Sequence, residues 1–148
     1  MDITVRRASA GDIETLLPLV RAYRAFYQQA PDEAGERRFV AKHLRDETST
    51  LFFASDGARA VGFVQIFESW STVRLAPVLI LEDLFVDPSH RLRGIGRALI
   101  HAAVAYARET GAAAMFLETA VDNERAQHVY EREGWQRERQ FHKYNAPL

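Results

Sequence analysis

The stretch from Leu81 to Leu99, LEDLFVDPSHRLRGIGRAL, most constrains the fold, because a strand, a turn and a helix are predicted one after another within it. The apolar run from Val78 to Val86, broken only by two carboxylates, predicts a buried strand. Asp87-Pro88-Ser89 ends this strand, since proline cannot extend a central ladder. Apolar residues spaced four, three and four apart then predict one face of a helix: Ile95, Leu99, Ala102 and Tyr106.

Three arginines and two glycines stand at the junction of this strand and this helix: Arg91, Arg93, Gly94, Gly96 and Arg97. Glycines let a backbone approach a ligand closely, and the unsatisfied N–H groups and dipole of a helix N-terminus favour an anion. Arginines add charge-assisted donors. The junction therefore predicts a phosphate-binding loop, although an ordinary glycine-containing turn with solvated arginines would have the same composition.

Two familiar phosphate-binding loops do not match this junction. The Walker pattern requires Gly-Lys-Ser/Thr, whereas Gly96 is followed by Arg97-Ala98. The Rossmann fingerprint requires a third glycine three residues after the second, and Leu99 occupies that position. A different type of phosphate-binding loop is therefore expected.

The composition bounds the class of protein. A length of 148 residues suits one domain with one hydrophobic core, and we expect a single domain over residues 1–148. The net charge of −1 gives no indication of a nucleic-acid partner. No apolar run approaches the ~20 residues of a membrane span, and the opening segment Met1–Val5 is too polar for a signal peptide. A cytoplasmic location is the expectation.

The residue types exclude several chemistries. The absence of cysteine excludes a disulfide, a thiol nucleophile and a thiolate metal site. The histidines have no metal-ligand spacing such as His-x-x-x-His, so no metal is expected, and they are predicted to lie at the surface or at interfaces: His43, His90, His101, His128 and His142.

The first half of the chain predicts a strand, two helices and a pair of strands. The strand covers Ile3–Arg7, and the first helix follows a capping-box-like Ser9 to Asp12. Pro18 is expected to kink that helix, because its ring displaces one backbone hydrogen bond. A more polar helix is predicted from Glu33 to Arg45. The remaining predicted segments are strands at Leu51–Ser55 and Ala60–Phe67, joined by the hairpin signal Asp56-Gly57, and a loop or strand continuation at Ser69–Ala76.

The second half completes an alternating pattern. The helix that begins near Ile95 ends at Thr110-Gly111, and a strand is predicted from Ala113 to Val121. Asp122-Asn123 caps a last helix that Gly134 closes, and Trp135–Tyr144 is predicted as the final strand region. The order is therefore β-α-α-β-β-β-α-β-α-β. An α/β fold with a mixed sheet and helices on both faces is the expected packing.

Two motifs and this order together resemble one superfamily. Arg91-x-x-Gly94-x-Gly96 is similar to the pyrophosphate loop of the GNAT superfamily of N-acetyltransferases, Arg/Gln-x-x-Gly-x-Gly/Ala. The run Asn123-x-x-Ala126-(x)3-Tyr130-(x)3-Gly134-Trp135 is similar to its second signature, and the element order matches over essentially the whole chain. The resemblance implies a mostly antiparallel twisted sheet and acetyl-CoA as the acetyl donor.

A narrower resemblance concerns the central strand. Leu81–Val86, LEDLFV, is similar to the central strand of the spermidine/spermine (diamine) acetyltransferases, although related sequences occur in other branches. The second signature is also similar to that of the histone-and-polyamine acetyltransferases. These similarities imply a polyamine, a diamine or a lysine-like compound as the acceptor.

Acetyl transfer from a thioester to an amine sets three chemical requirements. The amine must be neutral when it attacks, the carbonyl must be polarised, and the departing thiolate must be protonated. Without cysteine no acyl-cysteine can form, and no Gly-x-Ser-x-Gly elbow is present. Direct attack in a ternary complex is therefore the simpler mechanism.

Tyr130 is the candidate general acid. Its place in the second signature puts it on the same side of its helix as Ala126, toward the expected thioester sulfur. The alternative is a core tyrosine whose hydroxyl is hydrogen-bonded elsewhere, which is the commoner role of a helix tyrosine.

Glu82 and Asp83 are adjacent carboxylates inside an apolar strand, so alternation predicts that they point to opposite faces of the sheet. Burying either carboxylate unpaired would be costly. A structural salt bridge to Arg6 or Arg74 is one explanation. The other is a negatively charged amine-binding cleft, in which one carboxylate removes the ammonium proton through water; Glu82 is the candidate base and Asp83 the candidate amine-binding residue. Glu118, in the neighbouring predicted strand, could join them.

The resemblance implies further contacts. Phe85 and Val86 would contact CoA through backbone groups, because a pantetheine arm can pair like an extra strand. Asn123 would either cap its helix or contact CoA. Glu68 and Trp70 lie where the spermidine/spermine branch lines its substrate site. The implied pyrophosphate loop comprises Arg91, Leu92, Arg93, Gly94, Ile95, Gly96 and Arg97.

The sequence therefore predicts an acetyl-CoA-dependent N-acetyltransferase that acts on a small primary amine. A protein lysine or protein N-terminus is the rival acceptor within the same class. A CoA-binding module without catalysis, serving as a sensor or assembly subunit, is the alternative from a different class. The aromatic segment Phe141–Tyr144 could pair across a homodimer.

Overall fold

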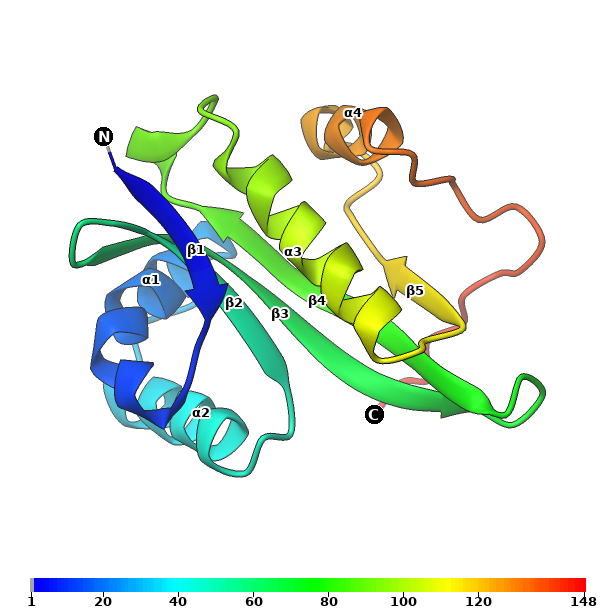
Figure 1. The fold of residues 1–148 in the computed structure, drawn as a ribbon, viewed down its shortest axis with the longest axis horizontal. Helices are drawn as coiled ribbons and strands as arrows, with labels where there is room; N and C mark the ends of the chain where they lie inside the picture. Colours follow the sequence, from blue (N-terminus) through cyan, green and yellow to red (C-terminus); the bar gives the residue numbers. More distant parts are fainter. Residues whose placement is uncertain (1) are drawn as a thin grey trace. The chain divides into compact units, whose positions relative to one another are not determined.

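A computed structural model describes residues 2–148 of the chain. The chain divides into two compact units, residues 1–118 and residues 119–148, which are described separately. The first unit contains a five-stranded sheet in the order β1-β2-β3-β4-β5 (Figure 1). Its strands are β1 (Ile3–Arg7), β2 (Thr50–Asp56), β3 (Arg59–Ser71), β4 (Ala76–Val86) and β5 (Ala114–Leu117).

The pairing is antiparallel from β1 to β4 and parallel between β4 and β5, so the sheet is mixed and mostly antiparallel, as predicted. The predicted hairpin turn at Asp56-Gly57 joins β2 to β3, and Gly57 takes a φ of +62° that favours glycine. Strand β3 is longer than predicted. It continues to Ser71, which pairs with Ala76, so the segment after Phe67 extends the β3–β4 hairpin.

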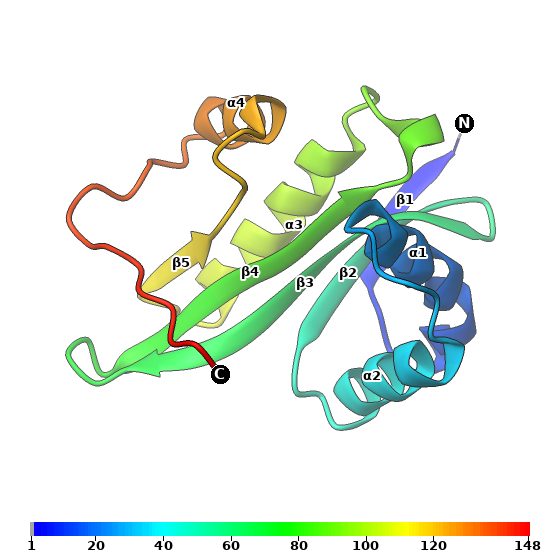
Figure 2. The ribbon, with the colours of Figure 1, turned by 180° about the vertical axis from the view of Figure 1, so that it is seen from behind.

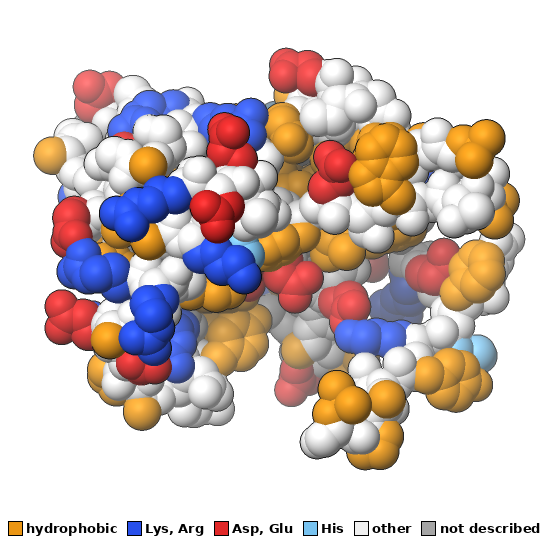
Figure 3. Space-filling view, turned by 90° about the horizontal axis from the view of Figure 1, so that it is seen from below, with side chains coloured by type: hydrophobic (Ala, Val, Ile, Leu, Met, Phe, Trp, Pro, Cys, Tyr) orange, Lys and Arg blue, Asp and Glu red, His pale blue; other side chains and the backbone are white. Residues whose placement is uncertain are grey.

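Helices cover both faces of this sheet. Helices α1 (Ile13–Phe26) and α2 (Glu33–Arg45) lie on one face, and α3 (Ile95–Glu109) lies on the other (Figures 1 and 2). Helix α1 is continuous through Pro18. Seen from below, the α2 end of the molecule carries interspersed basic and acidic side chains, as expected of a solvent-facing helix surface (Figure 3). The predicted fold class is confirmed.

The core between α1, α2 and the sheet is apolar and aromatic. Leu16 and Leu17 of α1 pack in one cluster with Phe53, Phe63 and Phe85 of the central strands. Such burial is the main favourable contribution to folding. The cluster holds α1 against β3 and against the end of β4, close to the candidate site residues in the second half of that strand.

The contact between α3 and the sheet depends on one glycine. A Cβ at Gly62 of β3 would stand 3.1 Å from the Phe85 carbonyl oxygen, 3.2 Å from Leu99 Cδ1 and 3.3 Å from Ile95 Cγ2. Because the position has no side chain, the first turns of α3 pack closely on β3. The N-terminus of α3 is thereby held beside the end of β4.

The second unit contains one helix, α4 (Glu124–Arg132). Among the described residues after α4, none is in a strand, so the strand predicted at Trp135–Tyr144 is wrong. The Glu138 carboxylate accepts hydrogen bonds from the backbone N–H groups of Gln140 and Phe141, which offers this polar segment a local alternative to a ladder. The strand predicted at Ala113–Val121 is also shorter than expected, since β5 ends at Leu117.

Candidate active site

Strand β4 carries a bulge at Glu82. Gln65 of β3 pairs with Asp83, and the next residue, Ile66, pairs with Leu81, so Glu82 is an extra residue on β4. A bulge of this kind bends its strand and disrupts the ladder locally. It also interrupts the alternation of side chains. The prediction that Glu82 and Asp83 point to opposite faces assumed a regular strand, and β4 is not regular at this position.

The pairing of β4 with β5 ends at the same place. It runs from Val78 opposite Ala114 to Leu81 opposite Leu117, and no strand of the described chain pairs with that side of β4 from Glu82 onward. A strand edge presents unpaired N–H and C=O groups and can pair with an extended ligand. Phe85 and Val86, the predicted backbone contacts, lie in this open part of β4.

The loop after β4 leads into a helix without a side-chain cap. Gly94 is the N-cap of α3, with a φ of +79° that favours glycine, and no side chain caps the helix there. The first-turn N–H groups of α3 therefore lack a capping side chain, and the first turn contains no acidic residue. This N-terminus offers N–H donors and a positive dipole end to an anion.

Gly96 leaves room at the same helix end. A Cβ built at Gly96 would meet only Val86 Cγ2, at 3.8 Å, among the described atoms. Packing within the chain therefore does not require glycine here, although glycine in a helix is less favourable than alanine. The space beside the first turn of α3 suits a ligand that approaches the backbone closely.

Arg91 is fixed at the end of β4. Its Nε donates a hydrogen bond of 3.1 Å to the Val86 carbonyl oxygen. Its guanidinium lies 5.7 Å from the centre of the Phe26 ring and 5.8 Å from that of Phe85, within the range of cation–π contacts. Arg91 is thus a positioned cation beside the helix N-terminus.

The other residues of the predicted loop divide into two groups. Leu92, Arg93 and Arg97 are exposed, and Leu92 has a φ of +63°. Ile95 is buried, so its side chain belongs to the core and its backbone N–H is the group available for a ligand.

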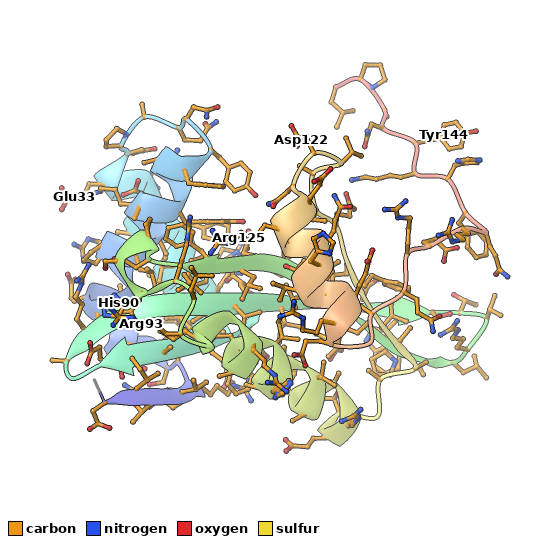
Figure 4. The ribbon with its side chains drawn as sticks, turned by 90° about the horizontal axis from the view of Figure 1, so that it is seen from above. Glu33, His90, Arg93, Asp122, Arg125 and Tyr144 are labelled. Carbon is orange, nitrogen blue, oxygen red and sulfur yellow. The ribbon has the colours of Figure 1, made fainter. Side chains whose placement is uncertain are left out.

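His90 corrects one prediction, because it is buried in this loop rather than at a surface or interface. Its Nε2 is 3.1 Å from Asp56 Oδ2 of the β2–β3 hairpin, and its Nδ1 is 2.9 Å from the Ser89 hydroxyl. Asp87 accepts hydrogen bonds from Ser89 and from Arg59 of β3. These contacts fasten the loop that carries His90 and Arg93 to the β2–β3 hairpin (Figure 4).

Asp83 lies in a hydrogen-bonded chain rather than in a salt bridge. Its Oδ1 accepts from the Tyr23 hydroxyl at 3.0 Å, and its Oδ2 accepts from Gln65 Nε2 at 3.1 Å. Gln65 Oε1 in turn accepts from the Ser49 hydroxyl at 3.0 Å. Burial, with the charge of Asp83 and its hydrogen bond, raises the pKa of Tyr23, so the phenol keeps its proton and donates.

The alternative salt bridges of the two strand carboxylates do not form. Arg6 pairs with Asp12, with 2.6 Å between Arg6 Nη2 and Asp12 Oδ1, and Arg74 Nη1 donates to the Ala113 carbonyl oxygen. Sequence analysis missed Tyr23 as the partner of Asp83. Tyr23 lies on the inward face of α1. Apolar spacing alone does not distinguish a tyrosine whose hydroxyl binds a carboxylate from an aromatic side chain that only packs in the core.

The remaining predicted carboxylates lie at different levels of the sheet. Glu82 is exposed at the bulge, and Glu118 is exposed directly after β5, one residue beyond the Leu81–Leu117 pair. Trp70 donates from Nε1 to Glu68 Oε1 at 2.9 Å, and both side chains are exposed. Trp70 pairs with Pro77, six residues along β4 from Asp83, or about 20 Å at the rise of a strand.

Two predicted site residues belong to the second unit. Asn123 Oδ1 accepts from the Ala126 backbone N–H at 3.1 Å, so Asn123 caps α4 as one of its two predicted roles requires. Tyr130 is half-buried on α4, with its ring centre 5.9 Å from that of Trp135. The Trp135 backbone N–H also donates to the Tyr130 carbonyl oxygen at 3.0 Å.

Residues 2–148 contain no group of His, Asp and Glu side chains that could hold a metal ion. No helix in the described part of the chain is long and apolar enough to cross a membrane.

Comparison with known proteins gives consistent results. The model of the Acetyltransferase (GNAT) family matches residues 16–135. An uncharacterized N-acetyltransferase of Bacillus subtilis (strain 168), YhfO, is 34% identical over 98% of this chain and 99% of its own length. The D-amino-acid N-acetyltransferase HPA3 of Saccharomyces cerevisiae is 26% identical over 97% of this chain and 91% of its own length.

The fold matches as well. The crystal structure of a probable acetyltransferase superposes with a TM-score of 0.93 and 34% identity, over 98% of this chain and 97% of the other. GNAT acetyltransferases use acetyl-CoA as the acetyl donor, and the uncapped start of α3, Arg91 and the open edge of β4 suit a phosphate followed by an extended arm. The chain belongs to the GNAT family of acetyltransferases.

Proposed function

We propose that this protein transfers an acetyl group from acetyl-CoA directly to the primary amine of a small cationic acceptor. The proposal depends on one observation. The bulge in β4 lies where its pairing with β5 ends, and the open part of β4 leads through one loop to the uncapped N-terminus of α3. One strand thus offers an edge for an extended arm and leads to donors for its phosphates. The family model spans parts of both units, which supports their action as a single domain.

The donor is bound by two groups of atoms in this proposal. The pyrophosphate is held by N–H groups from Gly94 to Arg97 and by Arg91, because an uncapped helix start with a fixed guanidinium favours an anion. The backbone of Phe85 and Val86 pairs with the amides of the pantetheine arm. Asn123, which already caps α4, is a further proposed contact.

Glu82 and Tyr130 carry the proton transfers in this proposal. Glu82, exposed at the bulge, removes the proton of the acceptor ammonium through water. The amine lone pair then forms the new C–N bond at the thioester carbonyl carbon while the C–S bond breaks, and the nitrogen loses its remaining extra proton to water to give the neutral amide. Tyr130 gives its hydroxyl proton to the departing thiolate and is reprotonated from solvent.

The acceptor is proposed to be a polyamine, a diamine or a lysine-like compound. Asp83 accepts its two hydrogen bonds from neutral donors, so its carboxylate can pair with an ammonium of the acceptor. Glu118 adds a second negative charge for the same acceptor. Glu68 and Trp70 would contact the distant part of a long acceptor. A protein lysine or a protein N-terminus is the rival acceptor. The protein is further proposed to be a cytoplasmic homodimer whose subunits meet at Phe141–Tyr144.

A thiol-release assay tests the proposal. Acetyl-CoA is incubated with the protein and with spermidine, putrescine, lysine, an aminoglycoside or a lysine peptide, and free CoA is measured. Release that depends on a small amine supports an N-acetyltransferase with a small-molecule acceptor. Release with the peptide alone would favour a protein acceptor. CoA binding by calorimetry without release from any amine would instead indicate a CoA-binding module.

A further inference from the structure

A cavity of about 370 Å³ lies between α1, α2 and strands β2 to β4. All its lining residues belong to the first unit. Most of its wall is hydrocarbon, contributed by Val20, Phe39, Val40, Leu44, Leu51 and Phe63. A dry apolar cavity of ~150 Å³ is sufficient to bind benzene. The volume therefore suits a compact hydrocarbon group larger than a single ring.

Two carboxylates in the cavity wall have no ion pair with a cation of residues 2–148, the exposed Asp32 and the half-buried Asp83, whereas Glu36 pairs with Arg24. Arg24 Nη1 lies 2.8 Å from Glu36 Oε2, and Asp32 Oδ1 accepts from the Gly35 backbone N–H at the start of α2. Asp83 accepts from two neutral donors, and among residues 2–148 no arginine, lysine or histidine forms an ion pair with it. A half-buried carboxylate without a cation favours a cationic ligand.

Asp83 also connects the cavity to the open edge of β4. It lines the cavity, and its backbone follows directly after the bulged residue Glu82. A ligand whose ammonium pairs with Asp83 would therefore have its nitrogen beside the strand edge proposed for the thioester arm. The hydrocarbon part of the same ligand would face the apolar wall.

We propose that the cavity receives the uncharged hydrocarbon group of the acceptor, so that the preferred acceptor is a monoamine carrying a compact aromatic or branched aliphatic group. The inference rests on the proposed acetyl transfer to a small cationic primary amine, and it names a monoamine as the preferred acceptor in place of the polyamine, diamine or lysine-like compound proposed above. A polyamine would bring a second ammonium against a mostly apolar wall, whose other carboxylate without a cation, Asp32, is exposed to solvent at the start of α2, and an ammonium held against hydrocarbon without a partner is costly. Transfer of a hydrocarbon group from water to this wall is favourable.

Binding and turnover are measured with matched probes. The probes are 2-phenylethylamine and 3-methylbutylamine, with putrescine, spermidine and the neutral alcohol 2-phenylethanol for comparison. Calorimetry on the whole protein with CoA gives the dissociation constants, and thiol release gives KM. We expect 2-phenylethylamine to bind at least tenfold more tightly than putrescine, spermidine or 2-phenylethanol. Asp83→Asn should abolish the difference between the amine and the alcohol.

Two phenylalanines provide a matched pair of variants. Phe39 lines the cavity and is 48% exposed, whereas Phe116 of β5 is 50% exposed and lies outside the cavity lining. Phe39→Ala should weaken 2-phenylethylamine binding about tenfold, because it removes part of the apolar wall. Phe116→Ala should change it less than twofold. Circular dichroism and the KM for acetyl-CoA should stay unchanged in Phe39→Ala.

The outcomes separate this inference from the proposed function. Tighter binding of putrescine or spermidine than of 2-phenylethylamine would overturn the inference, and so would equal effects of Phe39→Ala and Phe116→Ala. In either case acetylation of the diamine or polyamine would leave the proposed function standing. Conversely, Phe39-dependent binding of 2-phenylethylamine without acetylation of any amine would support the cavity assignment and refute the proposed reaction.

Discussion

The hydroxyl of Tyr23 donates a hydrogen bond of 3.0 Å to Asp83 Oδ1, and thereby joins helix α1 to strand β4 one residue after the bulge. The Tyr23 ring also packs edge-on against Phe63, with centres 5.3 Å apart. The same side chain therefore contributes to the core and orients a carboxylate that faces the cavity.

Tyr23→Phe should separate these two contributions. The ring contacts remain, whereas Asp83 loses one donor, and a hydrogen bond to a charged group contributes about 1.5–3 kcal/mol. We expect the free energy of unfolding, from urea denaturation, to fall by roughly 1–3 kcal/mol, and the KM for the acceptor amine to rise. Tyr144→Phe, at an exposed tyrosine outside the cavity lining, serves as the control for the KM and should leave it unchanged. An unchanged KM would mean that Asp83 does not need this orientation.

Gly96→Glu tests the proposed pyrophosphate site. The new side chain would place bulk and negative charge in the open space beside the first turn of α3, where an anion is expected. CoA affinity measured by calorimetry should fall by more than tenfold, while circular dichroism shows a folded protein. Gly11→Glu adds the same charge at another position with open space and should leave affinity unchanged. Equal affinities for the two variants would remove this loop from the donor site.

Tyr130→Phe tests the proposed general acid. The substitution removes the proton donor and little packing volume, and loss of a general acid typically reduces the rate about 10²- to 10⁴-fold. We expect kcat to fall by that order, with KM values for acetyl-CoA and amine changing much less. The comparison is made by thiol release at saturating substrates. A kcat close to that of the unsubstituted protein would identify Tyr130 as a core residue of its unit.

Glu82→Gln and Asp83→Asn distinguish the base from the binding carboxylate. Both changes keep the shape and remove charge, so neither should alter the KM for acetyl-CoA. Glu82→Gln should lower kcat and shift the pH–rate profile to higher pH. Without the carboxylate the protein no longer deprotonates the ammonium, so only amine that is already neutral in solution can react. Asp83→Asn should mainly raise the KM for the amine. If both variants handle the best acceptor normally, these carboxylates are structural.

The Arg6–Asp12 pair predicts a pH dependence of stability. The hydrogen bond from Arg6, which outweighs the effect of burial, holds the pKa of Asp12 below its ordinary value. A depressed folded-state pKa stabilises the fold above the unfolded-state pKa, about 3.9, and this contribution is lost as the pH falls through the folded-state pKa. Chemical denaturation between pH 3 and pH 6 should therefore show a weaker pH dependence for Asp12→Asn. A parallel dependence would contradict the assignment.

Local signals account for the parts of the structure that the sequence predicts. The strand at Ile3–Arg7 and the helix at Glu33–Arg45 have the expected bounds, because alternation and helical spacing act within a few residues. Asp87-Pro88 and Gly94 likewise mark the end of β4 and the start of α3. Proline, glycine and capping side chains restrict the backbone wherever they occur.

The features that the sequence did not predict depend on partners distant along the chain. Nothing near Glu82 distinguishes a bulge from a regular strand, because register is set by β3 and β5. His90 is buried because Asp56 faces it from another hairpin, which no spacing indicates. The C-terminal segment differs from these two cases: it has aromatic residues typical of a strand, but the Glu138 side chain accepts local backbone hydrogen bonds that compete with a ladder.

The bulge has a further consequence for how this strand tolerates change. Ile66 and Gln65 are neighbours on β3 and so face opposite sides, and their partners Leu81 and Asp83 do the same although they are two residues apart. Because of the extra residue, the odd- and even-numbered side chains of β4 exchange faces of the sheet at Glu82. Deleting Glu82 would make Leu81 and Asp83 neighbours in a regular ladder, so both residues would keep their partners and their faces, and the strand would lose its bend and one exposed carboxylate. The extra residue therefore shapes the edge of β4 and is not needed for the register of the strand.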